Sequence, residues 1–316
     1  MQQTLKAQMH ILVSIVCGLL LLSALFAGCT SSTSPSTTSA ATAAPVATTS
    51  VAAPVATPAA APAAPATPTS TPKPVYTYSE GNVVAFTAAS LSGVSPKLAA
   101  DFAKMYPGHR VDFNLDGTQA LKAQVQNGAY ADVFISASNS YTAELTKGGY
   151  FVDGTVQPLT SNYVIVILPA NNPANIKSLS DLAKPGVKIA MEDRSVPAGT
   201  ATVAVLANLA RSTGYDQAWN ASVFKNVVTY ETSEPAVANK VQLGEVDAGF
   251  VYESTYTAAA GKYQAITIPK NVNYLQTYTI GVLKGSTSKG AAADFENFML
   301  STVGQQDLKD YGFRPL

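Results

Sequence analysis

Short β-prone runs alternate with stretches of helical periodicity along the chain beyond residue 80. An apolar run at 83–86 precedes apolar residues at 91, 94, 98, 102 and 105, and their spacing predicts a helix. Further strands are predicted at 111–115 and 133–135, each followed by a helix. Strands that alternate with helices are typical of a mostly parallel sheet covered on both faces.

A second set of similar elements follows the apolar, β-branched run at 163–168, which carries the chain out of the first set. The pattern predicts helices near 178–183, from 197 and through 237–241, strands at 187–191 and 249–251, a return strand at 277–282 and a closing helix at 291–300.

These two sets predict an α/β fold with two hinge-linked lobes. Lobe 1 spans about 80–164 and 280–316, and lobe 2 spans about 165–279. A ligand cleft is expected between the lobes, because ligands bind where such α/β units meet.

The first 28 residues predict an export signal. Lys6 supplies positive charge, and residues 11–27 form an uncharged apolar run that is short for a membrane span. The segment Phe-Ala-Gly-Cys at 26–29 resembles a lipobox, at which the chain is cleaved and Cys29 is acylated. The alternative is an uncleaved signal anchor with Cys29 incidental. Both interpretations place the folded region outside the cytoplasmic membrane, and the first predicts a lipid-anchored protein.

Residues 29–75 predict a disordered tether between this signal and a folded domain at 76–316. The segment is almost entirely Thr, Ser, Ala, Pro and Val, and Lys73 is its first charged residue. Such a composition cannot bury enough apolar surface to offset the entropy of ordering.

Charge and composition exclude several classes of function. The chain has 20 basic and 20 acidic residues, scattered along it, which argues against nucleic-acid binding. Both cysteines, Cys17 and Cys29, precede the predicted domain, so no disulfide is expected there. His109 follows Pro-Gly and is predicted to be a turn residue, and no metal-ligand spacing, nucleophile elbow or phosphate loop occurs. We therefore expect a binding protein without enzymatic activity or a cofactor.

Several turns share one arrangement, in which a strand ends, small hydroxyl-bearing residues follow and a helix begins. Ser90 and Thr118 lie at two such turns. Free backbone N–H groups, the positive end of the helix dipole and a hydroxyl together form an anion site. Each hydroxyl taken alone could equally be an ordinary N-cap.

The order of the motifs resembles that of the molybdate-binding proteins of ABC importers. The motifs are Thr-Ala-Ala-Ser-Leu at 87–91, Ala-Asp-Val-Phe-Ile-Ser-Ala at 131–137, Val-Pro-Ala-Gly at 196–199, Asp-Ala-Gly-Phe-Val-Tyr at 247–252 and Tyr-Gly-Phe at 311–313. The resemblance implies a periplasmic-binding-protein fold of type II. It also implies a monomer that captures molybdate or tungstate and works with an ABC permease and its ATPase subunit.

The same resemblance implies five oxyanion-binding residues. They are Ser90, Thr118, Ala198, Glu234 and Tyr252, with Ala198 acting through its backbone N–H and Tyr252 through its phenolic O–H. In that family the anion is held by neutral hydroxyls and amides and not by buried Arg or Lys.

Glu234 is the main departure from the family pattern, because the bacterial molybdate binders have a small apolar residue there. Three hypotheses account for it. Glu234 contributes only its backbone N–H while its side chain points to solvent, or its carboxylate coordinates the metal centre directly, or it is protonated and donates a hydrogen bond. The second hypothesis resembles the archaeal tungstate binders, although Val196 stands where they carry an Asp.

Two other functions remain open from the residues alone. One is the binding of another oxyanion, either phosphate, whose proton would suit the Glu234 carboxylate, or sulfate, which offers only acceptors. The other is a surface adhesion or scaffold protein on a stalk. Asp132 is predicted to be structural, capping or pairing across its turn.

Overall fold

The computed structural model describes residues 81–315. The predicted export signal at 1–28, Cys29 and the predicted tether at 29–75 lie outside these residues. No helix of the described region has the length and apolar content that a membrane crossing requires.

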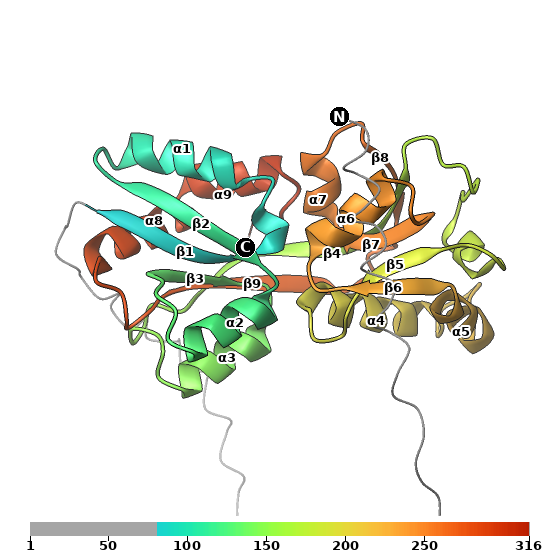
Figure 1. Cartoon of the computed structure of the whole chain (residues 1–316), viewed down its shortest axis with the longest axis horizontal. Coiled ribbons are helices and arrows are strands. Elements are labelled where there is room, and N and C mark those ends of the chain that lie inside the picture. The colour runs from blue at the N-terminus through green and yellow to red at the C-terminus, as the bar shows by residue number, and fades with distance from the viewer. Residues whose placement is uncertain (1–80, 316) are drawn as a thin grey trace, which may run out of the picture. The chain divides into compact units, whose positions relative to one another are not determined.

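Lobe 1 is a sheet with helices on both faces. Its strands are β1 (Asn82–Ala88), β2 (Arg110–Asp116), β3 (Val133–Ser136), β9 (Leu275–Val282) and the first half of β4 (Gln157–Pro169), in the order β2-β1-β3-β9-β4. Helices α1 (Ser95–Met105), α8 (Lys289–Leu300) and α9 (Thr302–Asp310) cover one face, and α2 (Thr118–Gln126) and α3 (Asn139–Lys147) cover the other (Figure 1). Leu98, Phe102 and Phe295 are fully buried under the first group, and Leu121 and Leu145 under the second.

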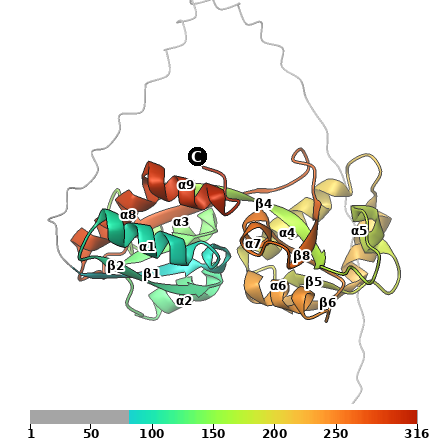
Figure 2. The same ribbon diagram turned by 90° about the horizontal axis from the view of Figure 1, so that it is seen from above.

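Lobe 2 repeats this arrangement. Its strands are the second half of β4 with β5 (Ile189–Glu192), β6 (Val227–Glu231), β7 (Ala248–Tyr252) and β8 (Tyr263–Thr267). Helices α6 (Glu234–Gln242) and α7 (Glu253–Ala258) lie on one side of this sheet, and α4 (Pro197–Leu209) and α5 (Gln217–Lys225) lie on the other (Figures 1 and 2). Apolar residues at helical spacing, such as Val237 and Val241 of α6, place the buried face of each helix against the sheet.

Strand β4 belongs to both lobes. Residues 157–163 pair with β9, and from Val164 onward β4 pairs with β7 and β8. At this switch point the side chain of Asn273 donates to the Val164 carbonyl at 2.8 Å and accepts from the Val164 N–H at 3.2 Å. The side-chain amide of Asn273 therefore bonds to the Val164 backbone as a neighbouring strand would. Asn273 lies just before β9, where the chain crosses between the lobes for the second time.

The predicted two-lobed α/β fold is confirmed, with one refinement of the sheets. Strands β1, β2 and β3 pair in parallel, as do β5, β6 and β7. Every pair made by β4 or β9 is antiparallel, because these two strands carry the chain out of lobe 1 and back again. Each sheet is therefore mixed rather than mostly parallel, and β9 pairs with lobe 1 strands from Leu275 onward.

The helix predicted near 178–183 is a 3₁₀ helix, η2 (Leu179–Ala183). A capping box fixes its start, with Ser178 and Asp181 each accepting from the other's backbone. A second 3₁₀ helix, η1 (Ala89–Leu91), joins β1 to α1. Both are short, as 3₁₀ helices usually are.

Asp132 fastens the turn before β3, which agrees with its predicted structural role. Its carboxylate accepts from the Val84 N–H at 2.8 Å, the Tyr130 hydroxyl at 2.5 Å and the Ser286 hydroxyl at 2.6 Å. The side chain is fully buried. Three segments distant in sequence therefore depend on one carboxylate.

We predict that Asp132→Ala lowers the free energy of unfolding by about 2–4 kcal/mol, because it leaves the Val84 N–H and the buried Ser286 hydroxyl without their acceptor. Urea unfolding of the purified protein measures this. The matched control is Asp153→Ala, since Asp153 is 96% exposed and pairs only with Lys284; its effect should stay within about 0.5 kcal/mol. Equal losses in the two variants would contradict this role of Asp132.

Candidate functional site

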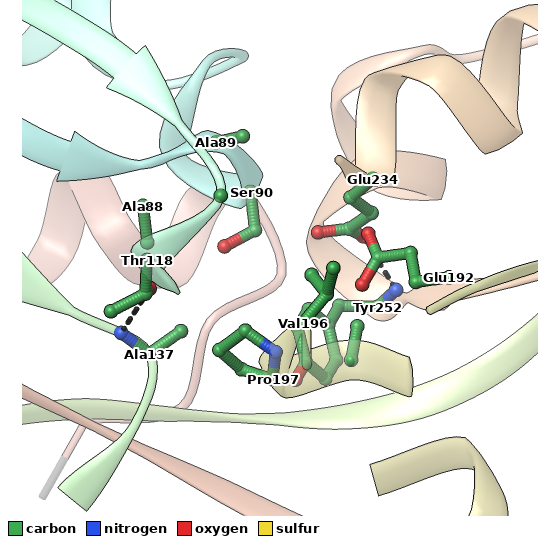
Figure 3. A pocket seen from close by; sticks show the side chains of 12 residues that line it. Ala88, Ala89, Ser90, Thr118, Ala137, Glu192, Val196, Pro197, Glu234 and Tyr252 are labelled. Atoms are coloured by element: carbon green, nitrogen blue, oxygen red, sulfur yellow. Dashed lines mark hydrogen bonds between the residues drawn. The ribbon is translucent and has the colours of Figure 1, made fainter. Parts of the chain in front are cut away.

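A small cavity lies where the two lobes meet. Its empty volume is about 230 Å³ even with the open solvent at its mouth included, so it suits a small ligand. Its walls come from the turns after β1, β2 and β3 in lobe 1 and from β5, α4, α6 and β7 in lobe 2 (Figure 3). The lining residues are Ala88, Ala89, Ser90, Gly117, Thr118, Ala137, Glu192, Val196, Pro197, Ala198, Glu234 and Tyr252.

The structure brings all five predicted site residues to this cavity. Ser90 and Thr118 come from lobe 1, and Ala198, Glu234 and Tyr252 come from lobe 2. All five are buried. The reason is topological: the C-terminal ends of the parallel strands of both lobes face one another here, and the helices that follow them begin at the cavity.

Three helices that begin at the cavity have no side-chain N-cap. Gly117 precedes α2, Val196 precedes α4 and Ser233 precedes α6, and none of them makes a capping hydrogen bond. Helices α5 and α9 begin away from the cavity and are capped by Asp216 and Ser301, whereas α3, which begins just after the cavity-lining Ala137, is capped by Ser138. Helices α1, α7 and α8 also lack caps, so the contrast is not absolute. The first amides of α2 and α6 remain available to an anion in the cavity, and the Ala198 and Gly199 amides at the start of α4 lie beside the Glu192 carboxyl group.

The hydroxyls of lobe 1 are arranged to donate into the cavity. Thr118 Oγ1 accepts from the Ala137 N–H at 3.2 Å, which leaves the hydroxyl proton of Thr118 free to point elsewhere (Figure 3). Ser90 Oγ lies 2.8 Å from the Tyr278 hydroxyl. When Tyr278 donates in this pair, the Ser90 proton is also free.

Tyr252 lines the cavity, but its hydroxyl already has a partner. It donates to the Gln276 Oε1 atom at 3.3 Å, a long hydrogen bond across the base of the cleft. Burial raises the pKa of Tyr252 well above its ordinary value, and the nearby Tyr278, Glu192 and Glu234 raise it further. Tyr252 is therefore a neutral donor, and its phenolic O–H reaches a ligand only by leaving Gln276.

Glu234 points into the protein, so the hypothesis that its side chain faces solvent is wrong. The residue is 3% exposed. Its Oε1 atom accepts from the Tyr252 N–H and from the Thr255 hydroxyl, both at 2.6 Å, and these two bonds hold the side chain inward. The Oε2 atom has no hydrogen-bond partner. Burial raises the pKa of Glu234 to about 7, although the bonds from Thr255 and Tyr252 oppose the rise.

A second carboxyl group, Glu192, shares the cavity and was not predicted. It is the last residue of β5, one position beyond the strand expected at 187–191, and it is 1% exposed. Neither of its oxygens has a partner in hydrogen-bonding geometry. Burial raises the pKa of Glu192 well above its usual range, and the charge of the neighbouring Glu234 raises it further. The backbone amides of Gly199 and Ala198 lower this pKa, but by less. The signal available in the sequence was an acidic residue directly ending a buried strand.

Cations are missing from the walls of this cavity. None of its lining residues is Lys, Arg or His. Within residues 81–315, no group of three or more His, Cys, Asp or Glu side chains is placed to hold a metal ion. The site can offer neutral hydroxyls, backbone amides and two carboxyl groups, and its chemistry is that of binding a small polar ligand.

Comparison with known proteins agrees with this description. A family model described as bacterial extracellular solute-binding protein matches residues 83–314. The molybdate-binding protein ModA of Mycobacterium tuberculosis is 31% identical over 237 residues, which are 75% of this chain and 86% of that protein.

Two solved structures share the fold. The periplasmic molybdate-binding protein of Azotobacter vinelandii matches with a TM-score of 0.64 and 23% identity, covering 73% of this chain and 98% of that one. The sulfate-binding protein SubI of M. tuberculosis matches with a TM-score of 0.65 and 21% identity, covering 74% of this chain and 87% of that one.

Proposed function

The chain belongs to the bacterial extracellular solute-binding proteins, and we propose that it captures molybdate or tungstate in the cavity between its lobes and delivers the ion to an ABC importer. The observation that carries the proposal is the convergence of uncapped helix starts and hydroxyls from both lobes on one small cavity without cations. Helix N-termini and hydroxyl donors suit a tetrahedral oxyanion, whose oxygens only accept hydrogen bonds. The similarity to the M. tuberculosis molybdate-binding protein supports this choice of anion.

In this proposal each predicted residue has a defined part. Ser90 and Thr118 donate hydroxyl protons from lobe 1, and Ala198 and Glu234 donate backbone N–H groups from the starts of α4 and α6. Tyr252 closes the base of the site and donates its phenolic proton when Gln276 releases it. The ion is held by its oxygen atoms, and no catalytic step is involved.

We further propose that the protein acts as a monomer outside the cell membrane, with a permease and an ATPase as its partners. The acylated Cys29 and the segment at 29–75 would anchor and tether the solute-binding domain. This part of the proposal is supported by the lipobox-like sequence at 26–29 and by the composition of the segment that follows.

Hydrogen phosphate is a second candidate, favoured by one observation. Glu192 and Glu234 leave three carboxyl oxygens without partners in the cavity. A carboxylate can accept from a protonated oxyanion, which molybdate, tungstate and sulfate at neutral pH are not.

We predict that molybdate and tungstate raise the melting temperature of the purified protein. Binding to the folded state alone stabilises it by about 4 kcal/mol when the ligand is in thousandfold excess over Kd. The measurement is a thermal melt with molybdate, tungstate, sulfate or phosphate, and chloride at equal ionic strength is the control. A shift with phosphate alone would support hydrogen phosphate as the ligand instead. No shift with any of the four oxyanions would refute the proposal of oxyanion binding.

Removing one hydroxyl tests the proposed residues. Thr118→Val should weaken molybdate binding about tenfold, because one donor to the ion is lost while the shape is kept. Thr146→Val is the matched control, since the Thr146 hydroxyl donates within its own helix, to the Thr142 carbonyl at 2.8 Å. Calorimetric titration measures both affinities. Equal molybdate affinities in the two variants would show that the Thr118 hydroxyl does not contact the ion.

Ligand capture in this fold requires the lobes to close on each other, and Gly117 lies at their contact. Gln119 of lobe 1 donates to the Thr232 carbonyl of lobe 2 at 3.0 Å, and Tyr141 donates to the Ser195 carbonyl at 2.6 Å. A Cβ atom on Gly117 would lie 2.4 Å from the Gln119 side chain of its own lobe, which is flexible, and 2.7 Å from the Thr232 backbone oxygen of lobe 2. That distance is shorter than real Cβ contacts allow, so a side chain here would hold the lobes apart.

We predict that Gly117→Ala weakens oxyanion binding by about 10- to 100-fold, equivalent to the 1–3 kcal/mol typical of overpacking, with little change in the stability of the ligand-free protein. Gly285→Ala is the control, because a Cβ there would meet nothing within 4 Å. Titration calorimetry gives the affinities and thermal melts give the stability. Tight binding by Gly117→Ala would show that this closed contact is not part of the bound state.

A further inference from the structure

The two carboxyl groups of the cavity are not explained by the binding of a dianion. Glu192 ends β5 and Glu234 begins α6, and their side chains approach each other at the lobe 2 wall of the cavity (Figure 3). Each is buried, and neither takes part in an ion pair with a described residue. Two buried carboxylates and a dianion in one cavity would repel one another strongly, because little solvent screens them.

The surrounding elements supply donors but no balancing charge. Strand β7 and helix α7 contribute the Tyr252 N–H and the Thr255 hydroxyl, and β9 contributes Tyr278, which burial keeps neutral by raising its pKa. The nearby charges are matched elsewhere. Glu231 of β6 lies 3.7 Å from Lys240, Glu253 of α7 pairs with Arg314 at 2.6 Å, and Asp193 accepts from Ser195 at the surface.

Protons are the remaining means of neutralisation. A protonated carboxyl group carries one O–H donor, and the free oxygens here are both oxygens of Glu192 and Oε2 of Glu234. These are the positions from which an O–H group could point at a ligand. Burial raises the pKa of both groups, that of Glu192 well above its usual range and that of Glu234 to about 7, which works in the direction of protonation.

We propose that Glu192 and Glu234 couple oxyanion binding to proton uptake, so that both carboxyl groups are protonated in the bound state and donate hydrogen bonds to the ion. This inference rests on the proposed oxyanion-binding function and adds Glu192 to the residues that contact the ligand. The protons come from solvent on binding and return to it on release.

The sign of the pH dependence follows from this coupling. A bound dianion raises the pKa of each carboxyl group above its value in the free protein, so binding is fully favoured below the free-state pKa and weakens as pH rises through and above it. For Glu234 that free-state pKa is about 7. Above it, affinity should fall about tenfold per pH unit for each proton taken up.

The test is calorimetric titration of the full protein with tungstate from about pH 6 to about pH 9, a range in which carboxyl groups with raised pKa values titrate. Each titration is run in two buffers of different ionisation enthalpy. The difference between the two measured binding enthalpies gives the number of protons taken up per ion, so this measurement needs no variant. The wild-type protein should take up between one and two protons per ion near about pH 9, and fewer near neutral pH, where the free protein already holds part of them. Its affinity should fall at least tenfold per pH unit above about pH 8.

Glu192→Gln supplies the matched variant, because its amide donates a hydrogen bond without needing a proton. We expect its proton uptake to fall by about one and its affinity at about pH 9 to exceed that of the wild-type protein by at least tenfold. Glu144→Gln, at an exposed position on α3, should keep the wild-type profile.

The outcomes are distinguishable. Tight binding with no proton uptake and no pH dependence would overturn the coupling and leave the proposed function intact. Binding that disappears when a chelator removes divalent cations would show that a cation, and not protons, neutralises the pair, and would overturn it as well. No binding of any oxyanion at any pH would overturn the proposed function itself.

Discussion

Strand β4 is shared by both sheets, and the geometry of the candidate site depends on that continuity. Its backbone pairs with lobe 1 strands up to Tyr163 and with lobe 2 strands from Val164 onward. The C-terminal ends of the parallel strands in the two lobes therefore face each other across a narrow gap. Helix starts, with their free amides, collect at that gap because each parallel strand leads into a helix there. The cavity is a consequence of the topology, and the side chains only refine it.

The electrostatics of the cavity are unusual for an anion site. Its walls contain no Lys, Arg or His, so attraction for an anion comes from helix starts and hydroxyls. Two acidic side chains instead lie among them. Burying an unpaired charge is costly, and a carboxyl group avoids that cost by keeping its proton. A neutral carboxyl group is also a hydrogen-bond donor, which turns an apparent obstacle to oxyanion binding into part of the binding surface.

Much of this arrangement could be predicted from the sequence, because helical and strand periodicities are local signals. The resemblance to one family also pointed to five residues from both lobes, and these five do lie together at the cavity. The weaker elements were missed for physical reasons. Strand β6 is an edge strand with Val228 and Tyr230 exposed, so it lacks a clear inward face, and α7 is too short to show a period.

Glu192 and the orientation of Glu234 could not be predicted in the same way. All four residues of β5 are buried, so no alternation indicated which way the Glu192 side chain points. The register between β5 and β6 also shifts at Ile189 and Ala190, just before this residue. The inward orientation of Glu234 depends on Tyr252 and Thr255, which are distant in sequence and reach α6 only in the folded protein.

The most direct test of oxyanion capture between the lobes is the position of a bound ion in a crystal structure of the protein with tungstate, because the anomalous scattering of tungsten locates the metal directly. We expect one tetrahedral ion in the cavity between the lobes. Its oxygens should lie within hydrogen-bonding distance of Ser90, Thr118, the Ala198 N–H and both carboxyl groups. An ion bound elsewhere on the protein, or a tungsten atom bonded directly to a Glu234 oxygen, would contradict it.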